Sequence, residues 1–302
     1  MGPITAVYQT TLKTPISCTG IGLHSGEKAV MIMHPAEAGT GIVFERTDLS
    51  NGARHFPARF DLVADTFLCT TLRNASGATL STVEHVMAAL AGCGVDNVLI
   101  EVSGPELPIM DGSSEAFVFL IECAGIEALE APRRFVRVLR EVQVRDGDKT
   151  ATLSPSANRS FRCEIVYDNE KIARQSAALD LDDDAFKSDV SRARTFGLME
   201  EIDGLRSQGL ALGGSLDNAI VVDGDRVLNE GGLRYDNEFA RHKVLDAIGD
   251  LALAGAPILG SFNGYCSGHG LNNKLLTALF ENDDAWCWET QHTAPDLLAA
   301  TA

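Results

Sequence analysis

The chain has 302 residues, of which 45% are hydrophobic and 22% are charged, and its formal net charge is −17 at pH 7. This composition is typical of a globular protein, and the length allows one large or two medium domains. The negative charge argues against nucleic acid or an anionic membrane surface as the main partner, because attraction to phosphates needs a basic patch. An anionic substrate must therefore meet a local basic group.

Seven cysteines are scattered through the chain without a Cys-x-x-Cys pair. This favours reduced thiols in a cytoplasmic protein over a disulfide framework or a thiolate zinc site. Residues 1–13 lack the apolar run of a signal peptide, and no window approaches the roughly 18 apolar residues of a membrane span. We therefore expect a cytoplasmic protein without stable membrane insertion. Nothing in the sequence indicates an obligate interface, so we also expect a monomer.

The first part of the chain has the period-two alternation and polar turns of an antiparallel sheet. Strands are expected at residues 6–12, 29–33, 41–44 and 67–72. A helix from Ser81 to about Ala91, a strand at 95–102 and a second helix at 113–124 follow.

A similar order of predicted elements begins again near Ala131–Arg134. Each half of the chain is therefore predicted to contain strands, a helix, a strand and a second helix, in that order. The second half predicts strands at 135–139, 141–145, 150–153 and 258–265, and helices around His242 and at 271–280. We infer an α+β fold of two similar domains, residues 1–130 and 131–302, each a mainly antiparallel sheet layered with two helices. Together they would form a sheet–helix–helix–sheet sandwich, with a ligand at the domain interface.

Two stretches depart from this repeated plan. Residues 195–232 are interpreted as an insertion with its own helix and a Gly213–Gly214 turn. The acidic run Asp180–Asp184 predicts a helix start or a solvated turn, because it lacks the spacing and the glycine of a calcium loop. Beyond about Glu289 we expect a frayed tail.

The helix expected over residues 235–250 is the most informative element. At about 100° per residue, His242, Asp246 and Asp250 share one side, opposite an apolar side that includes Leu245 and Ile248. A histidine and a carboxylate four residues apart can reach the same metal ion. The alternative interpretation is a solvated helix face with incidental charges.

Three further histidines could join this site. His85 follows Glu84 at the head of a helix, although Ser81-x-x-Glu84 is also the spacing of a capping box, and His85 could be a core histidine. His269 and His24 are flanked by glycines, which free the backbone to present an imidazole but also mark tight turns. The residues alone leave these alternatives open.

Taken together, these residues could form the active site of a metal-dependent hydrolase. His85, His242 and Asp246 supply three ligands with a fourth position open for water, which is the pattern of a catalytic zinc. Glu84 could accept a proton from that water, and His269, oriented by Asp250, could donate one. This set suits metal-assisted hydrolysis of an amide or an ester. The His-Glu-x-x-His and Pro-Cys-x-x-Cys motifs of other zinc hydrolases are absent.

Six segments then point to one family, and they run in this order: Ser81–His85, Pro108–Ser113, Ser191–Gly197, Leu216–Val222, Tyr235–Asp250 and Ser267–Lys274. From about Thr11 to Leu276, the chain resembles the UDP-3-O-acyl-N-acetylglucosamine deacetylases, the zinc amidases of lipid A synthesis in Gram-negative bacteria. Six motifs in the same order make this resemblance far more specific than any single signature.

The resemblance implies a role for each catalytic position. His85, His242 and Asp246 match the zinc ligands, and Glu84 matches the general base. His269 matches the cation that stabilises the oxyanion and protonates the leaving amine, with Asp250 as its partner. Thr195 matches a hydroxyl that helps to hold the tetrahedral intermediate. Two histidines and a carboxylate suit iron as well as zinc, so iron in the cell stays open.

The resemblance also implies the substrate contacts. Lys243 matches a diphosphate contact and Phe196 a contact to the sugar, while Tyr167 falls near the uracil position in a segment that departs from the usual pattern. Cys69 matches a cysteine near the zinc that could bind a second, inhibitory metal; a half-buried strand thiol is the alternative. The acyl passage corresponds to the insertion, with Leu198, Leu205, Leu210 and Leu212.

The expected reaction is zinc-dependent removal of acetate from UDP-3-O-[(3R)-3-hydroxyacyl]-N-acetylglucosamine, the committed step of lipid A synthesis. One alternative is a hydrolase of a different acylated sugar or amide built on the same site. Another is a metal-stabilised sugar-nucleotide binding protein without turnover. The open coordination position and the additional base and acid argue against the binding protein, because structural zinc sites are normally closed by four protein ligands. The preferred acyl chain length is not encoded in any of these motifs.

Overall fold

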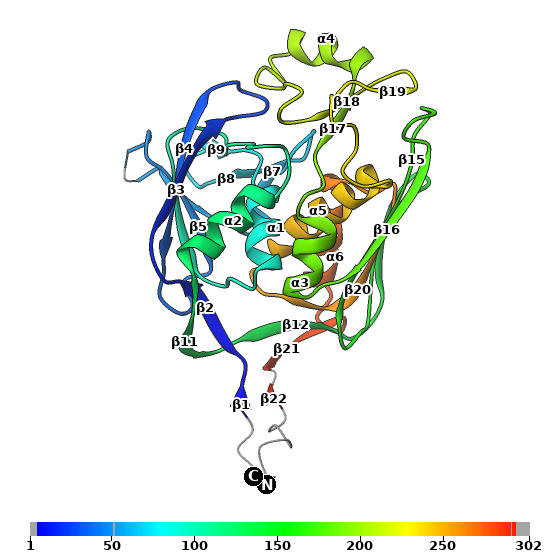
Figure 1. The fold of residues 1–302 in the computed structure, drawn as a ribbon. Coiled ribbons are helices and arrows are strands. Elements are labelled where there is room, and N and C mark those ends of the chain that lie inside the picture. The colour runs from blue at the N-terminus through cyan, green and yellow to red at the C-terminus, as the bar shows by residue number, and fades with distance from the viewer. Residues whose placement is uncertain (1–4, 51, 291, 294–302) are drawn as a thin grey trace, which may run out of the picture.

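The structure is a computed structural model that describes residues 5–50, 52–290 and 292–293. Figure 1 shows two outer sheets with helices between them. The first sheet has the order β3 (Ile16–Ile21), β4 (Lys28–Pro35), β10 (Val98–Val102), β5 (Ile42–Arg46) and β6 (His55–Pro57). Its neighbours are antiparallel except for β10 and β5. Alternate residues of β4, including Met31 and Met33, are buried beneath the helices, as expected of a sheet with one covered face.

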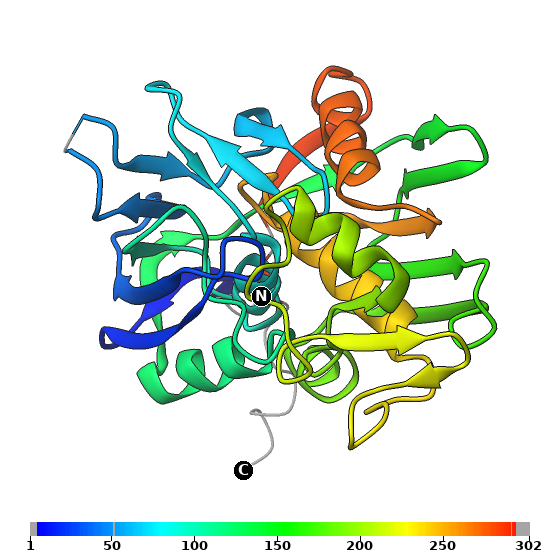
Figure 2. The ribbon, with the colours of Figure 1, turned by 90° about the horizontal axis from the view of Figure 1, so that it is seen from above.

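The second sheet has seven strands and lies on the other side of the helices (Figures 1 and 2). Its order is β13 (Val142–Asp146), β14 (Lys149–Ser154), β20 (Ile258–Tyr265), β12 (Arg134–Val138) and β21 (Trp286–Thr290). Strand β15 (Arg159–Val166) also pairs with β20, and β16 (Arg174–Asp180) pairs with β15. Strands β12 and β15 run parallel to β20, while the other pairs are antiparallel.

Four helices form the two inner layers: α1 (Glu84–Gly92), α2 (Glu115–Ala124), α5 (Glu238–Ala252) and α6 (His269–Phe280). Their positions between the sheets are clear in both ribbon views. The predicted α+β fold with a sheet–helix–helix–sheet sandwich is therefore confirmed. Strand β11 (Ile126–Pro132) pairs with β2 (Tyr8–Leu12), and β12 then enters the second sheet. The domain boundary at residues 130/131 stays a prediction.

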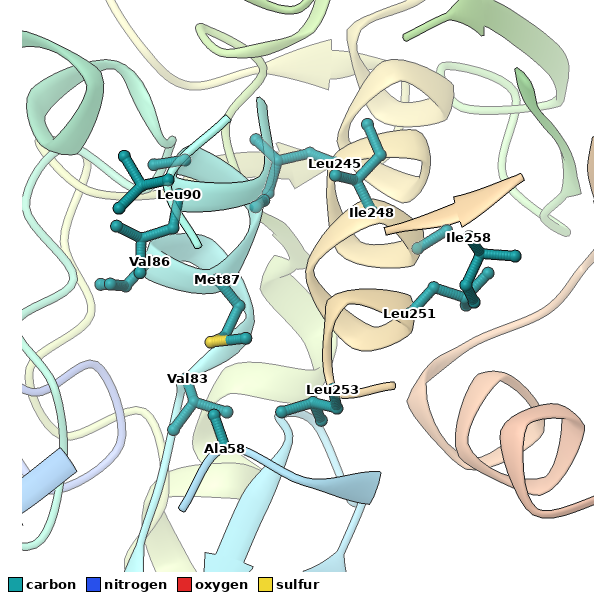
Figure 3. Close-up of a cluster of buried hydrophobic side chains, with 14 of the residues drawn as sticks. Ala58, Val83, Val86, Met87, Leu90, Leu245, Ile248, Leu251, Leu253 and Ile258 are labelled. Carbon is teal, nitrogen blue, oxygen red and sulfur yellow. The ribbon is translucent and has the colours of Figure 1, made fainter. Parts of the chain in front are cut away.

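Helices α1 and α5 meet at the centre of the molecule. Figure 3 shows Met87 and Leu90 of α1 in the same buried cluster as Leu245, Ile248 and Leu251 of α5. The two backbones approach so closely that a Cβ added at Gly249 would overlap the carbonyl oxygen of Glu84. Only glycine fits at position 249. Its lack of a side chain allows the first turn of α1 to lie directly against α5.

Short elements complete the chain. They are β1 (Thr5–Ala6) with β22 (His292–Thr293), β7 (Val63–Asp65) with β8 (Thr71–Arg73) and β9 (Thr79–Leu80), and β17 (Phe196–Leu198) with β18 (Ile220–Asp223) and β19 (Arg226–Val227). The helical ones are η1 (Phe60–Leu62), α3 (Asp183–Ala185), the π-helix η2 (Phe186–Val190) and α4 (Met199–Ser207). None of the helices within the described ranges is long and apolar enough to cross a membrane.

Several local predictions can be compared with this structure. The helix predicted inside the insertion is α4, and the acidic run leads into α3, where the Asp182 carboxylate accepts a hydrogen bond from the Ala185 N–H at 2.7 Å. Among the longer strands, β3, β11, β15, β16 and β21 have no counterpart in the sequence prediction. Residues 294–302 of the expected tail lie outside the described residues.

The strand predicted at residues 67–72 is wrong over its first four residues. The chain bends there, with Leu68 at a φ of 65°, and β8 begins only at Thr71. The Asp65 carboxylate accepts a hydrogen bond from the Phe67 N–H at 3.0 Å, which stabilises the turn. The apolar run was misleading because Phe67 and Leu68 are exposed, while Cys69 and Thr70 turn into the protein.

Candidate active site

Three potential metal ligands converge where α1 meets α5. His85 lies in the first turn of α1, and His242 and Asp246 are one turn apart on α5. The Asp246 Oδ1 atom lies 3.3 Å from His242 Nε2 and 3.9 Å from His85 Nε2. All three residues are buried, and their ligand atoms lie within 4.8 Å of one another. The interpretation of this side of α5 as a solvated face is therefore wrong.

The protonation states of these residues suit a cation. Burial, and then the neighbouring His242, lower the pKa of His85 to about 3, and burial also lowers the pKa of His242. Burial by itself would raise the pKa of Asp246, but His242 and Lys243 hold it below the usual range. At neutral pH the group therefore consists of two neutral imidazoles and one carboxylate, which are the forms that bind metals.

Two contacts orient these ligands. The His242 Nδ1–H donates to the carbonyl oxygen of Ala193 at 3.0 Å, which directs Nε2 toward Asp246. Lys243 Nζ donates to Asp246 Oδ2 at 2.8 Å, while Asp246 Oδ1 is buried and has no hydrogen-bond partner among the described residues. A buried carboxylate oxygen without a donor is costly unless a cation binds it. The donor set therefore fits a divalent metal ion.

Glu84 precedes His85 and is also buried. Its Oε2 accepts a hydrogen bond from the Thr70 N–H at 3.0 Å. Burial raises its pKa to about 7, assisted by Asp250 and Asp246 and opposed by His269. The capping-box interpretation is wrong, because the Ser81 N–H donates to the Pro105 carbonyl instead of to Glu84. A carboxyl group with a pKa near neutrality can exchange a proton at physiological pH.

His269, the first residue of α6, is paired with Asp250 of α5. Its Nδ1–H donates to Asp250 Oδ2 at 2.9 Å. Burial opposes the charged form of His269, but the carboxylate of Asp250 raises its pKa to about 9. Asp250 also accepts hydrogen bonds from Asn272 Nδ2 at 2.8 Å and from the Thr70 hydroxyl at 2.6 Å. His269 is therefore held as a cation near the carboxyl group of Glu84.

Two aromatic rings, those of Phe196 and Tyr167, lie on the side of the three potential ligands where His242 is found. The ring of Phe196 lies 6.2 Å from that of His242 and 5.7 Å from that of Tyr167, measured between centroids. Lys243 Nζ lies 5.6 Å from the centre of the Phe196 ring. The structure thus brings together three of the predicted substrate-binding residues, and Lys243 places a positive charge beside the Phe196 ring.

The segment before Phe196 is anchored by a buried ion pair. Arg194 Nε donates to Glu238 Oε1 at 2.9 Å, and Glu238 is fully buried at the start of α5. Thr195 follows, with its N–H bonded to the Gly112 carbonyl at 2.8 Å and its carbonyl oxygen accepting from Ile220. The ion pair fixes both the Ala193 carbonyl that contacts His242 and the path of the chain into Thr195.

The remaining residues predicted to bind substrate differ in how deeply they are buried. Cys69 is buried, and burial, with a smaller effect of Glu84, raises the pKa of its thiol to about 12, so the metal-binding thiolate is disfavoured. Leu198, Leu205 and Leu210 are half-buried on or beside α4, which has no fully buried residue. The roles predicted for these residues stay predictions.

Sequence reasoning missed several contributors. Thr70 lies outside the six motif segments, and Asn272 and Ala193 lie inside two of them without an assigned role. Only their hydrogen bonds connect these residues to the site. The role of His24 was left open. Its N–H donates to Glu106 at 2.9 Å, and both of its ring nitrogens are buried without a hydrogen-bond partner in the described ranges. Burial lowers the pKa of His24, opposed by the charge of Glu106 and assisted by His269. The glycines around His24 were its only sequence signal.

An α+β sandwich that holds such a His–His–Asp group between a buried carboxyl and a His–Asp pair belongs, as a class, to the metal-dependent hydrolases. Comparison with known proteins then gives the family. The family model described as "UDP-3-O-acyl N-acetylglycosamine deacetylase" matches residues 9–281. The chain belongs to this family.

Named relatives agree with this assignment. The chain is 51% identical over 288 residues to the UDP-3-O-acyl-N-acetylglucosamine deacetylase of Photobacterium profundum, covering 94% of each chain. It is 52% identical over 284 residues to that of Pasteurella multocida, covering 93% of this chain and 92% of the relative. It is 51% identical over 286 residues to that of Vibrio cholerae, covering 94% and 93%.

Proposed function

We propose that this protein removes the N-acetyl group of UDP-3-O-[(3R)-3-hydroxyacyl]-N-acetylglucosamine, releasing acetate and the free amine in the committed step of lipid A synthesis. The observation that carries the proposal is the buried group of His85, His242 and Asp246, placed between Glu84 and the His269–Asp250 pair. Membership in the deacetylase family supplies the substrate class.

His85, His242 and Asp246 would hold one divalent ion, and both zinc and iron suit two imidazoles and a carboxylate. When bound, the ion would act as a Lewis acid on the acetamide carbonyl and make water more acidic. The ligands are oriented without it, because Ala193 fixes the His242 ring and Lys243 fixes the Asp246 carboxylate. This preorganisation favours a single ligand geometry.

Glu84 and His269 would divide the proton transfers. Glu84, with a pKa raised to about 7, accepts the proton of the attacking water when it is ionised. His269, with a pKa raised to about 9 by Asp250, is charged at neutral pH, stabilises the developing oxyanion and donates a proton to the leaving amine nitrogen. In this proposal the Thr195 hydroxyl assists in holding the tetrahedral intermediate.

The groups beside His242 would bind the rest of the substrate. Lys243 provides positive charge for the diphosphate, Phe196 contacts the sugar, and Tyr167 stacks near the uracil. Leu198, Leu205 and Leu210 offer apolar surface for the acyl chain at α4. Amphiphilic substrates need both kinds of surface, because apolar burial supplies affinity and polar contacts fix orientation.

The test is acetate release from the acylated UDP-N-acetylglucosamine by chelator-treated protein, with and without one equivalent of zinc or ferrous iron. We expect activity only after a metal is restored. A folded, metal-loaded sample that releases no acetate would refute the proposal. Undiminished activity on a substrate without the acyl chain would instead favour a hydrolase of a different acylated sugar or amide.

A further inference from the structure

Thr70 contacts both proton-transfer groups of the site. Its N–H donates to Glu84 Oε2 at 3.0 Å, and its hydroxyl donates to Asp250 Oδ1 at 2.6 Å. Its carbonyl oxygen accepts a third hydrogen bond, from the N–H of Val83 just before α1, at 3.4 Å. Thr70 is only 2% exposed. All of its polar groups therefore connect the start of α1 to the C-terminal part of α5.

The hydroxyl bond matters because of how Asp250 is used. Oδ2 of Asp250 accepts from His269 and from Asn272, while Oδ1 accepts from Thr70. A carboxylate can rotate about its terminal torsion, and donors on both oxygens are needed to fix its plane. As the donor to Oδ1, the Thr70 hydroxyl therefore helps to hold the plane of the Asp250 carboxylate in the orientation that meets the imidazole of His269.

The bend at residues 66–70 delivers Thr70 to this position. Leu68 adopts a φ of 65°, and Phe67 and Leu68 point outward, so Cys69 and Thr70 turn inward. On the other side, the Thr66 side chain lies against Gly270, the residue after His269. A regular strand, whose residues alternate between two faces, would not bury Cys69 and Thr70 in succession.

We propose that Thr70 is a positioning residue for the deacetylation, acting on His269 through Asp250 and on Glu84 through its backbone N–H. This inference rests on the proposed function. Thr70→Val isolates the hydroxyl, because valine keeps the shape and the N–H to Glu84 but cannot donate to Asp250. Without that donor, Oδ1 of Asp250 is buried without the bond that fixes it, and the carboxylate can turn away from His269.

The titratable groups that face His269 set the expected pH response. They are Asp250, Asp246 and His242 on α5, Glu84 and His85 on α1, and His24 before β4. Of these, Asp250 is the direct hydrogen-bond partner. A looser Asp250 stabilises the imidazolium less, so His269 loses its proton at lower pH and the basic limb of the activity profile moves downward.

The experiment compares Thr70→Val, Thr70→Ser and the matched control Thr71→Val in metal-loaded, full-length protein. Thr71 is the buried neighbour whose hydroxyl donates to Ser81 instead of to the catalytic groups. For Thr70→Val we expect kcat to fall about 10- to 100-fold, as for groups that orient catalytic residues, with KM changed less than about threefold. The basic limb should move down by about half a pH unit or more. Thr70→Ser, which keeps the hydroxyl, and Thr71→Val should stay within about threefold of the wild type.

A wild-type kcat in Thr70→Val, or an unchanged or raised basic limb, would overturn the positioning role. Equal losses in Thr70→Val and Thr71→Val would do the same, because they would indicate general destabilisation of the loop. If Thr70→Val does not fold, Thr70→Ala is judged by the same criteria. An inactive wild type would refute the proposed function itself, which separates the two failures.

Discussion

Helices α5 and α4 are both amphipathic by sequence, yet the structure uses them in opposite ways. Twelve of the fifteen residues of α5 are buried, including Glu238, His242, Asp246 and Asp250. No residue of α4 is buried, and Met199 at its start is 46% exposed. The charged groups of α5 are paired inside the protein, Glu238 with Arg194 and Asp250 with His269, whereas the apolar side chains of α4 are at most half-buried. Substitutions in α5 should therefore affect metal binding, chemistry and folding together, and those in α4 should leave metal binding and chemistry unchanged.

The largest difference is expected between Asp246→Ala on α5 and Asp203→Ala on α4. Asp246→Ala removes the carboxylate that contacts both histidines, so metal content should fall and acetate release should drop by more than about 100-fold, the upper range for groups that only support a ligand. Asp203 is exposed, so its removal should change neither. Metal analysis and an acetate assay on both variants test this, and a metal-loaded, active Asp246→Ala would contradict the ligand assignment.

The pH profile tests the buried pair on α5 and α6. The wild-type rate should rise as Glu84 ionises near pH 7 and fall as His269 loses its proton near pH 9, because the base must be charged and the acid protonated. His269→Gln should lower kcat about 10²- to 10⁴-fold and remove the basic limb. His55→Gln, at an exposed histidine, is the control. A basic limb that survives in His269→Gln would exclude His269 as the acid.

A pair of glycine substitutions compares the two helices directly. Gly249→Ala should overlap the Glu84 carbonyl, push α1 from α5 and cost about 1–3 kcal/mol of unfolding free energy, with weaker metal binding because His85 moves away. Gly204→Ala on α4 meets open space and should stabilise the protein by about 0.5–1 kcal/mol. Denaturant unfolding and metal titration measure both effects. Equal stability of the two variants would show that the close approach at Gly249 is not required.

The smallest effect is expected for the apolar surface of α4. Leu205→Ser should raise KM for the acylated substrate about tenfold, from the loss of one apolar contact, and leave kcat, metal content and melting temperature unchanged. On a substrate without the acyl chain the variant should equal the wild type. Leu139→Ser, at an exposed leucine beyond β12, is the control. A change in kcat or metal content would mean that α4 contributes to the catalytic core.

Sequence reasoning succeeded where the signal was local. The spacing of His242, Asp246 and Asp250 on one helix follows from the period of the α-helix, and α5 places all three in the buried site. Strand alternation predicted β4, β14 and β20 for the same reason. Strand alternation failed at residues 67–70, where the apolar run forms a bend. Two of its side chains point outward and two point into the protein.

What the sequence by itself determined was the α+β class, the helix faces and the residue types of the metal-binding group. The tertiary structure alone decided that Glu84 is paired with Thr70 instead of capping its helix, and that Thr70 reaches Asp250 across 180 residues of chain. It also decided that Gly249 allows α1 and α5 to touch. The physical reason is that periodicity constrains neighbours within one element, whereas contacts between elements depend on how closely two backbones can pack.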